Sequence, residues 1–156
     1  MPAIGKVSLK GLPVEDFINT FLVKIGGSEA TQADAGNAAM SIDTTTANQV
    51  KLAVDGERIY GRLEVREDRV QEGIVVGSIA RKGGVTFNVS PTVSLSSPIT
   101  NPAIGDFLVG AVNGSAKGGF VRKASTAEIQ AGKSNWQVVE LITNADTTKS
   151  VVAIDV

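Results

Sequence analysis

The sequence RIYGRLEV at residues 58–65, followed by GIVVGSIA at residues 73–80, carries the pattern that decides the fold. Every second residue from Ile59 to Val65 is apolar or glycine, and the residues between them are Tyr, Arg and Glu. A period of two is typical of a β-strand with one buried face. The two stretches are therefore predicted to form neighbouring strands with a turn near Gly73, since glycine accepts a positive φ without steric cost.

The same alternation continues on both sides of this pair. Further strand-like runs are VKLAV (50–54), VTFNV (85–89), GDFLVGAV (105–112), GGFVRKA (118–124), WQVVELI (136–142) and SVVAIDV (150–156). Turn sequences separate several of them, namely DGE (55–57), KGG (82–84), NG (113–114) and TNADTT (143–148). We therefore expect an all-β fold that is mainly antiparallel and barrel- or sandwich-like.

The N-terminal third is harder to interpret. Residues 14–25 place apolar side chains at helical spacing, but FINTFLV within them is rich in β-branched and aromatic residues that also suit a strand. The sequence of this segment therefore fits both a short helix and a strand. We expect an N-terminal arm and variable segment at 1–49 and a β-rich core at 50–156, with two small lobes at 50–90 and 105–156.

The composition limits what chemistry the chain can perform. It has no Cys and no His, its net charge is −1, and no dense block of Lys and Arg occurs. The usual nucleophile–base pairs and most zinc or haem ligands are therefore missing, and the electrostatic footprint of a nucleic-acid-binding protein is absent. No spacing indicates a carboxylate pair, a Ser–Lys dyad or a calcium loop, so we expect no catalytic residues, metal site or cofactor and no enzyme activity.

One motif invites a different interpretation. AEIQAGKS at residues 127–134 matches the loosest form of a phosphate-binding loop, in which Lys133 would contact phosphates and Ser134 would hold Mg²⁺. A true loop of this kind leads into a helix, whereas here the strand-like NWQVVELI follows at once. We interpret Gly132 and Lys133 as a surface turn, and Trp136 as a core or interface anchor.

The segment VTFNVSPTVSLSSPITNPAIG at residues 85–105 contains three prolines and no charged residue. It is typical of an edge strand that runs into a long surface loop. It also suits an arm that lies on another protein, because its burial would desolvate no charge.

These features occur together in one family of proteins that the sequence resembles. The run ADAGNAAMSIDTTTANQVKLAVDGERIYGRLEVREDRVQEGIVVGSIARKGG, then NPAIGDFLVGAVNGSAKGGFVRKAS and NWQVVEL, resembles the small β-rich capsid decoration (cement) proteins of tailed bacteriophages. The resemblance implies a viral structural protein made in the host cytoplasm that binds the outer surface of a phage head and stabilises the shell. It also implies the major capsid protein as partner and a homotrimer at threefold positions, without direct contact to nucleic acid or membrane.

Interface residues are expected in the N-terminal arm, in the uncharged segment and at the tryptophan: Ile4, Val7, Leu9, Val93, Leu95, Pro98, Ile99, Pro102 and Trp136. Two other functions remain open, another virion part such as a tail tube or head fibre, and a surface-displayed sugar-binding β module. A sugar-binding module normally presents exposed aromatic rings, and this chain has one Trp and one Tyr.

Overall fold

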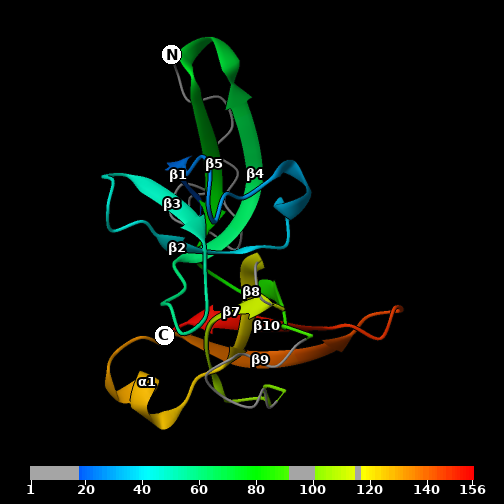
Figure 1. Cartoon of the computed structure of the whole chain (residues 1–156). Helices are drawn as coiled ribbons and strands as arrows, with labels where there is room; N and C mark the ends of the chain where they lie inside the picture. The colour runs from blue at the N-terminus through cyan, green and yellow to red at the C-terminus, as the bar shows by residue number, and fades with distance from the viewer. Residues whose placement is uncertain (1–17, 92–100, 115–116) are drawn as a thin grey trace, which may run out of the picture.

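A computed structural model describes residues 18–91, 101–114 and 117–156 and confirms the all-β fold (Figure 1). The described residues form ten strands, one short α-helix and two short 3-10 helices. The strands belong to a closed barrel and to a second, five-stranded sheet, with the barrel above that sheet in Figure 1. Antiparallel pairing dominates, as expected.

The barrel is built from the first five strands in the order β1-β3-β2-β4-β5. Its elements are β1 (Ile18–Val23), β2 (Ala39–Ile42), β3 (Gln49–Leu52), β4 (Gly61–Arg69) and β5 (Ile74–Ala80), with 3-10 helices at Gln32–Asp34 and Val70–Glu72. The side chains that fill it are fully or nearly fully buried and include Val23, Met40, Val50, Leu63 and Ile79. Beyond the barrel wall the β4–β5 hairpin projects away from the second sheet (Figure 1).

The second sheet has the order β6-β10-β9-β7-β8. Its elements are β6 (Val85–Asn88), β7 (Phe107–Asn113), β8 (Lys117–Lys123), β9 (Trp136–Thr143) and β10 (Lys149–Asp155), with α1 (Thr126–Gln130) between β8 and β9. A parallel bridge from Val89 to Val121 connects the β6 end of the sheet to β8. The sheet therefore curls, and its concave face holds a core that includes Phe87, Trp136 and Val151.

The alternative between helix and strand for residues 14–25 is decided in favour of a strand where the structure describes it. β1 pairs with β5 in antiparallel register from Ile18 to Leu22 and with β3 in parallel register at Leu22 and Val23. These two partners satisfy the backbone of β1 from both sides, which outweighs its helical spacing of apolar residues. Residues 14–17 lie outside the described part of the chain.

The division of the chain differs from the expected one. β1 and β2 precede residue 50 but belong to the barrel, so the segment 1–49 is not separate from the β core where it is described. β6 lies within the expected first lobe at 50–90, yet it pairs with β10 in the second sheet. The reason is that long-range strand pairing, which leaves no local signal, assigns each strand to a sheet.

The helix α1 was not expected. It begins after Ser125, whose side chain accepts a hydrogen bond from the backbone N–H of Glu128, while the Glu128 carboxylate accepts one from the Ser125 N–H. This capping box satisfies donors that the first turn of a helix leaves free. The Ser-x-x-Glu spacing from Ser125 to Glu128 was the available signal, although the helix that begins after Ser125 is only five residues long.

Candidate functional site

Most of the residues expected at an interface cannot be placed. Ile4, Val7, Leu9, Val93, Leu95, Pro98 and Ile99 lie outside the described residues. Pro102 and Trp136 are described, and both are buried.

Trp136 anchors the contact between the barrel and the second sheet. Its indole packs edge-to-face against Phe87 with ring centroids 5.0 Å apart, and its Nε1–H donates a hydrogen bond of 3.2 Å to the carbonyl oxygen of Ile59. Ile59 and two alanines of the barrel, Ala39 and Ala53, belong to the same buried cluster as Trp136. The sequence left two interpretations of this tryptophan, a core residue or an interface anchor. Its place in the buried cluster shared by the barrel and the second sheet favours the core.

The junction between the two sheets is made by one loop of the barrel, residues 53–57, which we call the junction loop. The N–H of Gly110 on β7 donates to the Glu57 carbonyl at 2.8 Å, and its carbonyl accepts from the Gly56 N–H at 3.0 Å. A Cβ on Gly110 would lie 2.5 Å from the Val54 carbonyl oxygen, and a Cβ on Gly118 equally close to that of Ala53. The backbones approach this closely because these positions carry no side chain.

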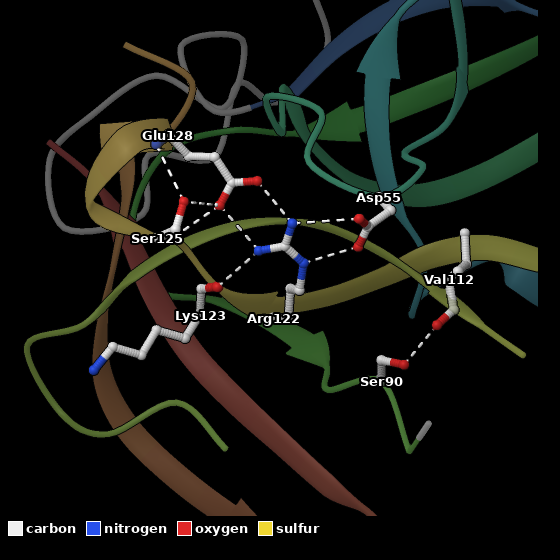
Figure 2. A network of polar contacts seen from close by, with 7 residues as sticks. All are labelled: Asp55, Ser90, Val112, Arg122, Lys123, Ser125 and Glu128. Atoms are coloured by element: carbon white, nitrogen blue, oxygen red, sulfur yellow. Dashed lines mark hydrogen bonds and ion pairs between the residues drawn. The ribbon is translucent and has the colours of Figure 1, made fainter. Parts of the chain in front are cut away.

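A buried arginine, Arg122 of β8, ties the junction loop to α1 (Figure 2). Its Nε and Nη2 donate to the Asp55 carboxylate at 2.8 and 3.4 Å, and its Nη2 and Nη1 donate to the Glu128 carboxylate at 2.7 and 3.0 Å. Nη1 also donates to the Lys123 carbonyl oxygen at 3.0 Å. All five N–H groups of the guanidinium thus have acceptors, while the residue is only 4% exposed.

The protonation states within this network are held by its own contacts. Hydrogen bonds from Arg122 lower the pKa of Glu128 to about 2, against the opposing effect of burial, and the Ser125 N–H and hydroxyl add to the lowering. Hydrogen bonds to Glu128 and Asp55 raise the pKa of Arg122 above its ordinary value. The network therefore joins two carboxylates to one guanidinium at neutral pH, and its chemistry is that of a structural clamp.

Several large apolar side chains are exposed on β9 and near the described end of the uncharged segment. Ile104 is 67% exposed, Val139 43% and Leu141 51%; we call these three residues the β9 patch. The Gly105 N–H donates to the Val138 carbonyl at 2.8 Å, which holds the backbone next to Ile104 against β9. Leu141 lines a groove of about 120 Å³ together with Val89, Asn101, Pro102, Ile142, Thr143, Lys149, Ser150 and Val151.

The apparent phosphate-binding loop is a surface turn in the structure. Gly132 has a φ of 68°, Lys133 is exposed, and α1 precedes the motif while β9 begins two residues after Ser134. No helix N-terminus follows the glycine and lysine to face a phosphate, which was the reason for doubting the motif.

Two features are absent from the residues that the structure describes. Within them no group of three or more acidic side chains is arranged to hold a metal ion. Within the same residues no helix is long and apolar enough to cross a membrane.

A second cavity lies between the barrel and the second sheet, beside Trp136. This interlobe cleft has a volume of about 430 Å³ and is lined by Ser41, Ile42, Thr44, Glu57, Arg58, Ile59, Tyr60, Arg81 and Asn135. The arginines of this cleft were not expected as site residues from the sequence, and neither were Arg122, Asp55 and Glu128. Charged residues in strands and turns are usually solvated, and only the Ser-x-x-Glu spacing pointed to one of these side chains.

No protein-family model, no curated protein and no solved structure matches this chain.

Proposed function

We propose that the chain is a decoration protein that binds the outer surface of a phage capsid and stabilises the assembled shell. The observation that carries the proposal is the β9 patch, because its three large apolar side chains are exposed on or next to β9, and one of them, Leu141, lines a groove with Pro102 at the described end of the uncharged segment. Clusters of this kind on a protein surface mark contact sites for other proteins more often than isolated apolar residues do.

The rest of the molecule supports a role in binding rather than in chemistry. The fold is a pair of β structures whose junction is held by backbone hydrogen bonds, a shared core and a buried ion network. The resemblance to decoration proteins rests on the same strands and turns. A protein that binds only the assembled shell stabilises it through linkage, without needing a cofactor.

The proposed partner is the major capsid protein, and the proposed assembly on the shell is a homotrimer. A trimer presents three copies of the β9 patch to one symmetry axis, so individually weak contacts act together and dissociate slowly. Sedimentation equilibrium of the free protein at micromolar concentration should give the mass of three chains. A monomer both in solution and on the shell would contradict this assembly.

The experiment that tests the function mixes the purified protein with expanded heads that lack it. Bound copies per head and the temperature at which DNA escapes are then measured. We expect saturable binding and a higher escape temperature. If the protein does not bind expanded heads, or if heads fail to assemble without it, the proposal is wrong.

Two variants locate the contact. Leu141→Asp places a charge in the β9 patch. Losing the burial of the leucine side chain and desolvating the new carboxylate should together cost about 2 kcal/mol per contact, or roughly 30-fold in affinity. Val70→Asp is the matched control, since Val70 is 85% exposed at the end of the β4–β5 hairpin and lies outside the patch. Equal binding by both variants would exclude the β9 patch as the contact surface.

A further inference from the structure

The interlobe cleft contains charged groups that the proposed contact with a shell does not use. Its walls come from the barrel, from Arg81 in the connection between β5 and β6, and from Asn135 just before β9. A volume of about 430 Å³ lies in the range of small-molecule sites, which is roughly 300–1,000 Å³. The cleft is therefore large enough for a small ligand or for one polar side chain of a partner.

Both carboxylates at the cleft already have partners. Glu57 accepts hydrogen bonds from Lys51, from the Ser41 hydroxyl at 2.8 Å and from the Val54 N–H at 3.1 Å. Burial raises the pKa of Glu57, but these hydrogen bonds, with Lys51 the strongest, lower it overall, so this carboxylate stays ionised at neutral pH. Glu57 and Lys51 therefore form a neutral pair.

The second carboxylate, that of Asp155, is neutralised in the same way. It accepts a hydrogen bond of 3.3 Å from Arg81 and one of 2.8 Å from the Asn135 amide. Arg81 also lies over the Tyr60 ring, with its guanidinium carbon 4.8 Å from the ring centroid. The aromatic face and the carboxylate hold this guanidinium at the wall of the cleft while part of it stays exposed.

Arg58 remains as the cleft cation that has no carboxylate partner among the described residues. Among the described residues its one hydrogen bond is a long contact of 3.4 Å from Nε to the Asn135 side-chain oxygen. No described residue accepts a hydrogen bond from its two Nη groups, which leaves these donors to a ligand. The lining residues and their direct partners thus comprise three cations and two carboxylates: Lys51, Arg58 and Arg81 against Glu57 and Asp155.

We propose that the interlobe cleft binds an oxyanion, a carboxylate or a phosphate group, through the free edge of Arg58. A guanidinium binds such groups in a bidentate manner, and Thr44 supplies a hydroxyl in the same cleft, whereas the Ser41 hydroxyl already donates to Glu57. The excess positive charge favours an anion over a neutral or cationic ligand. This inference does not depend on the proposed function.

The test titrates the full-length protein with two probes, inorganic phosphate and a tetraglutamate peptide, at constant ionic strength. NMR signals of the arginine Nε–H groups report binding at Arg58 and Arg81, and the fluorescence of Trp136, next to Asn135, reports it independently. Binding of phosphate alone identifies a small anion as the ligand, and preferential binding of the peptide identifies acidic side chains of a partner. Absence of saturation with both probes below about 10 mM would overturn the proposal.

Matched variants separate a site from general electrostatic attraction. Arg58→Gln should weaken binding by about tenfold, because it removes a charge-assisted bidentate contact. Arg69→Gln removes the same charge from the exposed β4–β5 hairpin and should change binding by less than about twofold. Equal weakening in both variants would show that no site exists. Arg58→Lys, which keeps the charge but loses the planar pair of donors, should bind with intermediate affinity, and the titration of the unmodified protein remains decisive if a variant does not fold.

Discussion

Replacing Arg122 by methionine tests whether the ion network holds the barrel to the second sheet. The substitution keeps an unbranched side chain of similar reach but removes five N–H donors from a position that is 4% exposed. It leaves the Asp55 and Glu128 carboxylates near each other without the cation between them. Because both side chains are largely buried, water does little to offset their repulsion. Removing one partner from a buried ion pair usually costs about 3–5 kcal/mol.

We expect a loss near the lower end of that range, about 3 kcal/mol, because both carboxylates keep some contact with water. With a urea dependence of about 2 kcal/mol per molar, the unfolding midpoint should fall by about 1.5 M. Unfolding is best followed by far-UV circular dichroism and by the fluorescence of Trp136, which sits at the junction. Diverging curves would show that the junction opens before the sheets unfold.

The matched control is Arg69→Met. Arg69 pairs with Glu67 and Glu72 on the exposed hairpin, where such pairs contribute about 0–1 kcal/mol. If Arg122→Met costs no more than this control, the ion network does not hold the junction and the reasoning fails. The deficit of Arg122→Met should also shrink as the pH is lowered, since protonation relieves the repulsion between the two carboxylates.

Three further predictions concern the same elements. The folded-state pKa of Glu128, about 2, lies below its ordinary value of 4.5, so the stability that this carboxylate contributes should be lost as the pH falls through this interval. In urea unfolding over the same pH range, Glu128→Gln should lose less stability than the wild type. Gly110→Ala should cost at least about 1–3 kcal/mol, because its Cβ would lie 2.5 Å from the Val54 carbonyl oxygen, whereas in Gly84→Ala the new atom meets only a methyl group of Val152 at 3.1 Å; thermal melting compares the two. Lys133→Ala should change stability by less than about 0.5 kcal/mol, and equilibrium dialysis of the unmodified protein with ATP and Mg²⁺ should detect no binding; saturable binding abolished by this substitution would contradict the assignment of a surface turn.

The local part of the fold could be predicted because its signals lie within a few residues. The alternation from Ile59 to Leu63 corresponds to the start of β4, and Gly73 takes a φ of 66° at the expected turn. Val65 does not follow it, because the pairing with β5 shifts register between Leu63 and Val65 and leaves Val65 56% exposed. The first strand was ambiguous, since one sequence supports both periodicities until its partners are known. The grouping of strands into sheets is likewise decided by pairing between distant segments.

The candidate site could not be predicted for a related reason. Asp55 and Arg122 are 67 residues apart and each has the character of a surface residue in its own segment. They are buried because two glycine-containing strands allow the junction loop to lie on the sheet. That close approach depends on glycines whose role is visible only once the opposing backbone is placed.

The junction and the cleft depend on the same short piece of chain. Asp55 binds Arg122 on one side of the loop, and three residues later Arg58 lines the cleft and contacts Asn135, just before β9. A buried ion network adds little net stability compared with an apolar core, but its directional bonds define one arrangement of its partners. The five satisfied donors of Arg122 therefore fix where the loop lies on the second sheet. This position in turn sets where Arg58 lies relative to Asn135, so a substitution that loosens the clamp should weaken oxyanion binding although it changes no residue of the cleft.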